Sequence, residues 1–248
     1  MPIIESVSVC IARVPLDQPV RFSTRQVTAR EYALIRVRST DGYEGLGYCY
    51  AVNSAGRLLS VAATDLLAQK LIGQDSHRIE GLWSEMYQEA LLLGRAGAVM
   101  RVLSALDIAL WDLNARSAAL PLYRYLGASK LDRVPAYASG GYYLPGKTPR
   151  HLAEEMEGHV REGFKAVKMK VGMLDVAQEY ERLAAVREAI GDDIRLMLDA
   201  NNAWRDLPTA LEYTQCFEEF RPFWLEEPFS PDDIDNHARL AAATRVTI

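Results

Sequence analysis

Apolar and polar residues alternate differently in two regions of the chain. The first region, residues 1–128, opens with three segments in which apolar and polar residues alternate as in strands. These segments are 3–14, 31–40 and 43–51. Asp41 and Gly42 separate the last two, and Asp-Gly between such segments is typical of a tight hairpin. Apolar residues at helical spacing follow over 55–73 and 98–127. A sheet followed by helices predicts an α+β domain.

The second region, residues 129–248, alternates short apolar segments with helical ones. The expected strands are 133–141, 165–172, 194–200, 222–228 and 245–248. The first expected helix has Thr148 as its N-cap, Pro149 at its first position and Gly163 at its end. Repeated strand–helix alternation predicts a parallel sheet or a (β/α) barrel, of which five strands fall within this sequence.

Composition narrows the classes of function. With 49% hydrophobic and 25% charged residues, the chain has the composition of a soluble protein, and its net charge of −5 argues against a nucleic-acid partner. No apolar run approaches the roughly 20 residues that cross a membrane. We see no signal peptide at the start, and the three cysteines are widely spaced. These features predict a cytoplasmic protein without disulfides or a membrane anchor.

Two lysines stand on one face of a strand that is otherwise apolar. Lys168 and Lys170 are two residues apart and therefore point the same way, whereas Val167, Met169 and Val171 point the other way. Two neighbouring positive charges repel each other, so this arrangement costs free energy unless the protein uses the charges for a function. The alternative is the solvated face of an edge strand, but strands in a βα array normally have both faces covered.

Carboxylates end the next two strands. Asp199 follows Lys170 by 29 residues, and Glu226 follows Asp199 by 27, so each step is about one βα unit. The side chains are therefore expected at one rim of the sheet, with Asn201 two residues beyond Asp199. Oxygen ligands without cysteine or histidine favour a hard cation, Mg²⁺ first. Asp199 and Asn201 are also common turn formers, so a purely structural role for either stays open.

Three motifs in register carry a family resemblance. "KMK" at 168–170, "LDANNAW" at 198–204 and "WLEEP" at 224–228 resemble the mandelate racemase and muconate lactonizing enzyme branch of the enolase superfamily. The segment 104–127 resembles the helix that leads out of that family's capping domain. The resemblance covers the whole sequence. It implies an α+β capping domain, 1–128, followed by the N-terminal part of a TIM-type barrel, 129–248, with about five of its eight strands.

The resemblance also implies a role for each candidate residue. Asp199 and Glu226 would bind Mg²⁺, and it is the resemblance that favours Glu226 over Glu227. Lys170 would remove the proton α to a carboxylate, with Lys168 beside it, and Asn201 would contact the substrate. A neighbouring ammonium and partial burial disfavour the protonated form of such a base. Segments 21–27 and 50–53 would be capping-domain loops, and a third metal ligand is expected just beyond Ile248.

The implied function is a Mg²⁺-dependent reaction through a metal-stabilised enolate. Racemisation or epimerisation and the dehydration of acid sugars are the first candidates, on a hydroxy acid or sugar acid. A muconate-type cycloisomerase or a dipeptide epimerase is the alternative within the family, and a phosphate-ester lyase is the alternative outside it. The rival of another class is an inactive fragment or pseudoenzyme that acts as a binding module. We expect a homo-oligomer.

Overall fold

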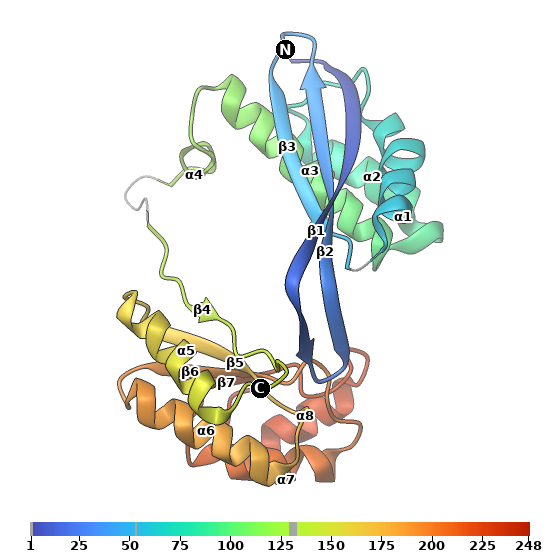
Figure 1. The fold of residues 1–248 in the computed structure, drawn as a ribbon. Coiled ribbons are helices and arrows are strands. Elements are labelled where there is room, and N and C mark those ends of the chain that lie inside the picture. Colours follow the sequence, from blue (N-terminus) through green and yellow to red (C-terminus); the bar gives the residue numbers. More distant parts are fainter. Residues whose placement is uncertain (1, 53, 129–132) are drawn as a thin grey trace. The chain divides into compact units, whose positions relative to one another are not determined.

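A computed structural model describes residues 2–52, 54–128 and 133–248 (Figure 1). Contacts divide the chain into two compact units. The first unit contains residues 1–17 and 28–133, and the second contains 18–27 and 134–248. The predicted domain boundary at 128/129 adjoins residues that lie outside the described ones and stays a prediction. Residue 53, in the predicted loop 50–53, also lies outside them.

A three-stranded sheet forms one layer of the first unit. Its strands are β1 (Ile4–Phe22), β2 (Arg25–Ser39) and β3 (Glu44–Tyr50), in the order β1-β2-β3. β2 and β3 are antiparallel, and the pair Arg38 with Glu44 lies next to the predicted Asp41-Gly42 turn. The hairpin is therefore confirmed. β1 and β2 extend further than expected, because both continue to a turn at residues 23–24 that carries no glycine or asparagine.

Helices cover one side of this sheet (Figure 1). They are α1 (Gly56–Val61), the π-helical segment η1 (Ala62–Leu67), the 3-10 turn η2 (Ala68–Lys70), α2 (Ile79–Gly94) and α3 (Ala98–Ser117). The short α4 (Leu122–Tyr125) contacts α3 instead. The long α3 packs directly on β3, where a Cβ atom on Gly47 would lie 1.9 Å from the carbonyl oxygen of Ala105. The helical pattern predicted over 98–127 is thus interrupted before Pro121, which begins the short α4.

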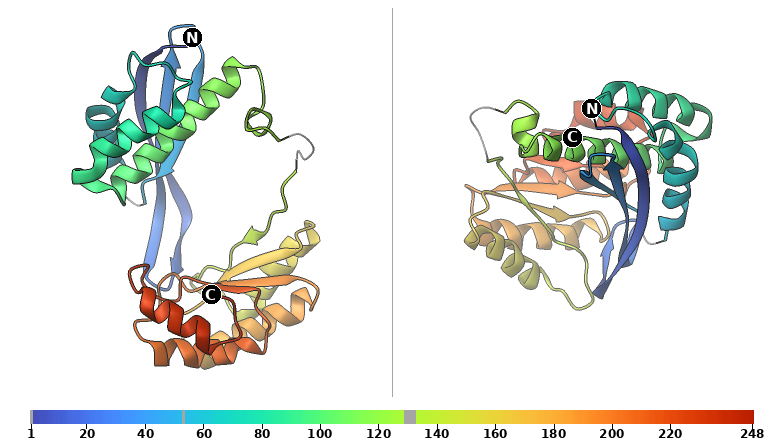
Figure 2. Two further views of the ribbon diagram at one scale, coloured as in Figure 1. Left: turned by 180° about the vertical axis from the view of Figure 1, so that it is seen from behind. Right: turned by 90° about the horizontal axis from the view of Figure 1, so that it is seen from above.

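The second unit has a parallel sheet with helices on one face (Figure 2). Its strands β4 (Ala138–Ser139), β5 (Ala166–Lys170), β6 (Arg195–Asp199) and β7 (Trp224–Glu226) are ordered as in the chain. Its helices are α5 (Pro149–Arg161), α6 (Val176–Ile190), α7 (Leu207–Glu218) and α8 (Ile234–Ala243). Residues 245–248, the fifth expected strand, do not form a regular strand. They lie beside β7, where the Leu225 N–H donates to the Thr247 carbonyl over 2.8 Å.

Capping side chains begin the four helices of the second unit. Thr148 accepts from the backbone N–H of His151 at the start of α5, with Pro149 at the first helical position as predicted. Aspartates cap α6, α7 and α8 in the same way, and they are Asp175, Asp206 and Asp233. Each cap satisfies a backbone donor that the helix leaves unpaired. In the described part of the chain, no helix is long and apolar enough to cross a membrane.

The core of the second unit lies between the sheet and its helices. Val167 and Met169 of β5 and Leu198 of β6 are fully buried there, together with Leu183 of α6. Because side chains alternate along a strand, Lys168, Lys170 and Asp199 must leave the sheet on its other face. This apolar layer therefore fixes the face on which the charged candidates stand.

Candidate active site

Strand register aligns the candidate residues across three neighbouring strands. Lys170 of β5 pairs with Asp199 of β6, and Asp199 pairs with Glu226 of β7. All three are the last residues of their strands. The sequence spacing predicted one rim for these groups, and the structure places them there. The C-terminal ends of barrel strands are where such enzymes carry their chemistry.

The two lysines and two carboxylates are in direct contact. Lys170 Nζ lies 2.6 Å from Asp199 Oδ2. Lys168 Nζ lies 2.8 Å from Glu226 Oε2 and 3.3 Å from Asp199 Oδ2. The cluster therefore balances two cations with two anions, and Asp199 contacts both lysines.

Burial strengthens these contacts and excludes the solvated-edge alternative. Lys168 and Lys170 are only 8% and 7% exposed, and Asp199 is 2% exposed. Burial lowers the pKa of Lys168, but its hydrogen bond to Glu226 and the charges of Asp199 and Glu226 raise it by more. The pKa of Lys168 therefore lies above its ordinary value. Paired in this way, Lys168 keeps its proton.

Asp199 contacts both the lysines and the turn that follows β6. Its Oδ2 faces the lysines, while its Oδ1 accepts the backbone N–H of Asn201 over 3.0 Å and so shapes the turn after β6. Asn201 stands there with φ +47°. Its Nδ2 donates to Glu227 over 3.2 Å, which places Glu227 beside the turn.

One side-chain atom of Asn201 is left without a partner in the described part of the chain. Within the described residues, its side-chain oxygen is buried and has no hydrogen-bond partner. A buried acceptor without a donor costs about 1–3 kcal/mol, so such an atom calls for an explanation. A substrate hydroxyl would satisfy it, which is consistent with the predicted substrate contact.

Sequence reasoning missed the aromatic residues around the lysines. Lys168 Nζ lies 5.8 Å from the ring centre of Tyr137, and Lys170 Nζ lies 5.5 Å from Tyr142 and 5.8 Å from Phe22. Tyr137 and Tyr142 flank β4, which was visible as a strand, but nothing in its pattern indicated which aromatic residues would face the site.

The turn between β1 and β2 belongs to the second unit by its contacts. Thr24 donates to the Asn201 carbonyl over 3.1 Å, and Ser23 donates to the carbonyls of Ala200 and Asn201. The predicted loop 21–27 thus rests on the turn that follows Asp199. Its hydroxyls fix the backbone of the candidate substrate contact.

The donor set suits a hard divalent cation. Asp199 and Glu226 offer two carboxylates on adjacent strand ends. Across residues 2–52, 54–128 and 133–248, no three His, Cys, Asp or Glu side chains gather as a metal-binding group. Two carboxylates fit Mg²⁺, which commonly binds one or two of them and keeps several waters. The residues present therefore fit part of a Mg²⁺ site.

Two curated relatives align with almost the whole chain. L-talarate/galactarate dehydratase of Salmonella typhimurium is 38% identical over 97% of this chain and 61% of its own length. The 3,6-anhydro-alpha-L-galactonate cycloisomerase of Streptomyces coelicolor is 35% identical over 99% of this chain and 67% of its own length. The chain thus spans about three fifths of the first relative.

Solved structures agree with these alignments. A racemase from Streptomyces coelicolor with bound magnesium matches 99% of this chain and 68% of its own, with TM-score 0.93 and 34% identity. A mutant of the Salmonella dehydratase liganded with Mg and L-glucarate matches 98% of this chain and 62% of its own, with TM-score 0.88 and 34% identity. Both include the sheet that carries the lysines and carboxylates.

Two family models cover most of the sequence. The mandelate racemase / muconate lactonizing enzyme N-terminal domain matches residues 4–127, and the enolase C-terminal domain-like model matches 151–248. These matches confirm the predicted α+β capping domain and partial barrel. The chain belongs to the mandelate racemase and muconate lactonizing enzyme branch of the enolase superfamily.

Proposed function

We propose that the full-length protein is a Mg²⁺-dependent acid-sugar dehydratase. In this reaction the protein removes the proton α to the carboxylate of a sugar acid. The resulting enolate then loses its β-hydroxyl, which leaves as water when it takes up a proton, and the enol product becomes a keto acid. The observation that carries the proposal is the buried contact of Lys168 and Lys170 with Asp199 and Glu226 at adjacent strand ends. The 38% identical dehydratase supports the choice of substrate class.

Lys170 is the base in this proposal. Its strand ends at the rim, and its amine is held 2.6 Å from Asp199, which fixes the side chain. Lys168 keeps a positive charge next to it, where it stabilises negative charge that develops on the substrate. The buried Asn201 oxygen accepts a substrate hydroxyl.

Asp199 and Glu226 would hold the cation. A bound Mg²⁺ would supply positive charge beside the substrate carboxylate, where the enolate develops.

Proton abstraction can be tested directly. Full-length protein with Mg²⁺ is incubated in D₂O with a panel of aldaric and aldonic acids, galactarate and talarate first. Proton NMR follows loss of the α-proton signal and formation of a keto acid. Replacing a general base removes about 10²–10⁴-fold of rate, so Lys170→Ala should lower exchange by at least that factor.

Lys165→Ala is the matched control for this test. Lys165 directly precedes β5 and is exposed, so its loss should leave exchange unchanged. Exchange at the wild-type rate in Lys170→Ala would overturn the assignment of the base. Absence of exchange in the wild-type protein with every acid would overturn the proposed function.

A cycloisomerase is the second candidate. The 35% identical cycloisomerase aligns with 99% of this chain, so the same first step fits both reactions. Mass spectrometry of the products of a reaction in H₂O separates the two, because cycloisomerisation gives a product of unchanged mass, whereas dehydration gives one that is lighter by one water.

A further inference from the structure

The edge of β5 is left unpaired at the residue that we assign as the base. The Gly140 N–H donates to the Lys168 carbonyl over 2.9 Å, as in a regular ladder with β4. Gly141 then turns the chain away with φ +68°, so β4 offers no further donor. Carbonyls two residues apart point to the same edge of a strand. The Lys170 carbonyl therefore needs a donor from elsewhere.

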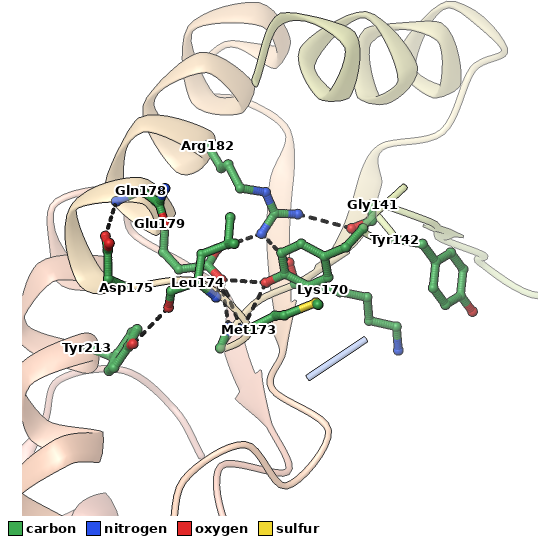
Figure 3. A network of polar contacts seen from close by, with 12 residues as sticks. Gly141, Tyr142, Lys170, Met173, Leu174, Asp175, Gln178, Glu179, Arg182 and Tyr213 are labelled. Carbon is green, nitrogen blue, oxygen red and sulfur yellow. Dashed lines mark hydrogen bonds and ion pairs between the residues drawn. The ribbon is translucent and has the colours of Figure 1, made fainter. Parts of the chain in front are cut away.

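Arg182 of α6 supplies that donor. Its Nη1 donates to the Lys170 carbonyl over 3.0 Å, and its Nη2 donates to the Gly141 carbonyl over 3.1 Å. One planar guanidinium thus joins the ends of two strand segments, which a lysine ammonium cannot do with the same geometry. In Figure 3 the guanidinium lies between α6 and Gly141, and the Lys170 side chain extends away from it toward Tyr142.

Glu179 and Tyr143 hold the guanidinium in place. Glu179 Oε2 is ion-paired with Arg182 Nη1 (Figure 3). The centre of the Tyr143 ring lies 4.0 Å from the guanidinium carbon. Arg182 is 6% exposed and Glu179 is fully buried. A buried pair of this kind is stable only when its hydrogen-bonding groups find partners.

The second carboxylate oxygen of Glu179 accepts hydrogen bonds from the loop that follows β5. Glu179 Oε1 accepts the backbone N–H groups of Gly172, Met173 and Leu174 over 2.9, 3.2 and 3.2 Å. It also accepts the Tyr143 hydroxyl. Burial and the Glu179 charge raise the pKa of Tyr143, so that the hydroxyl stays protonated and remains a donor.

We propose that Arg182 and Glu179 are positioning residues for Lys170. Arg182 fixes the backbone of Lys170 through its carbonyl. Glu179 fixes the loop that follows Lys170 through its N–H groups. The proposal rests on the proposed function, in which Lys170 removes the α-proton. A base must be held close to its productive geometry, and a shift of about 1 Å can cost about a hundredfold in rate.

Arg187 offers an internal comparison on the same helix. Its guanidinium donates to the carbonyls of Phe220, Gly191 and Ile194 over 2.8–3.1 Å. These carbonyls precede β6 and β7, at the end of the sheet opposite to the candidate site. Arg187 therefore matches Arg182 in residue type, helix and hydrogen bonding to backbone carbonyls. It differs in the end of the strands that it holds.

The test compares Arg182→Lys with Arg187→Lys in the full-length protein. Both changes should lower the thermal midpoint, because both remove hydrogen bonds to backbone carbonyls. Only Arg182→Lys should lower kcat, by about a hundredfold with little change in KM. Arg182→Met should lower it further, because it also leaves Glu179 unpaired. An equal fall of kcat in the two lysine variants would show a merely structural role and overturn the proposal.

A second measurement does not depend on turnover. Acetic anhydride labelling, read by mass spectrometry, reports how fast the Lys170 amine reacts relative to the exposed Lys165. Lys170 should react faster in Arg182→Lys than in wild type, and at the wild-type rate in Arg187→Lys. Unchanged labelling in Arg182→Lys would overturn positioning even if no acid is turned over. Absence of turnover with increased labelling would overturn the proposed function alone.

Discussion

The two units differ in the polar groups that they bury. The described buried polar residues of the first unit are Glu31, Ser39, Ser76 and Asn114. Those of the second unit are Lys168, Lys170, Glu179, Arg182, Asp199 and Thr214. One of the four is charged in the first unit, and five of the six are charged in the second.

Buried hydrogen bonds in the first unit tie loops and helix starts to neighbouring elements. Asn114 donates to the Ser76 carbonyl over 2.8 Å and accepts the Ser76 hydroxyl over 2.6 Å. Glu31 accepts the backbone N–H of Gly56 over 2.6 Å. Asn114 thus ties the segment before α2 to α3, and Glu31 ties the start of α1 to β2.

The buried charges of the second unit gather around the end of β5 instead. Burying an ion costs several kcal/mol, which its partners offset only in good geometry. Apolar side chains at the same positions would hold the strands together without this desolvation cost. The difference teaches that the first unit uses polar groups to build its fold, whereas the second spends stability on a prepared site.

The largest expected effect comes from removing one charge of the second unit. Asp199→Asn keeps the acceptor for the Asn201 N–H but leaves two buried lysines with Glu226 alone. The free energy of unfolding should fall by about 3 kcal/mol, measured by urea unfolding, and the proposed turnover should be lost because Asp199 is a proposed metal ligand. Adding Lys170→Met removes the lysine that has lost its partner and keeps the pair of Lys168 with Glu226, so it should recover more than half of the lost stability. Additive losses in the double variant would contradict this account.

A smaller loss is expected in the first unit. Asn114→Ala leaves the Ser76 hydroxyl and carbonyl without their partner, which should lower the free energy of unfolding by about 2 kcal/mol. The exposed Ser104 on the same helix is the control, since Ser104→Ala should change stability by less than about 0.5 kcal/mol. A loss as large as that of Asp199→Asn would erase the distinction between the units.

The smallest expected effect is a gain in the free energy of unfolding, at a position in α5 outside the buried charged cluster. Gly158 lies inside α5 with open space around the position of a Cβ atom, so Gly158→Ala should raise the free energy of unfolding by up to about 1 kcal/mol. Gly163 follows the helix with φ +101°, and Gly163→Ala should instead destabilise. Thermal unfolding of the two variants measures the contrast. A gain in both would show that backbone conformation plays no part.

Much of the candidate site could be predicted because its signals are local. The alternation of Lys168 and Lys170 with apolar residues marked one face of a strand, and regular spacing carried Asp199 and Glu226 to the same rim. The Asp41-Gly42 hairpin was visible for the same reason, since turn chemistry is local. Both features depend on a period or a turn rather than on distant packing.

Arg182 and Glu179 could not be found this way. They lie in the charged segment 178–182 of α6, where charges at helical spacing are typical of a solvated face. Their burial depends on carbonyls and N–H groups that the chain brings near only after β4 and β5 have paired. The long β1–β2 pair was also underestimated, because its turn at 23–24 contains no glycine, proline, asparagine or aspartate to mark it.

The turn at residues 18–27 carries a consequence for biosynthesis. It belongs to the second unit, yet more than a hundred residues of the first unit separate it from residue 134, where that unit resumes. This segment therefore emerges from the ribosome long before the strands that it contacts have been synthesised. The first unit has its complete sequence while the turn still lacks its partners. At about 5–20 residues per second, residues 28–133 alone take roughly 5–20 seconds to synthesise.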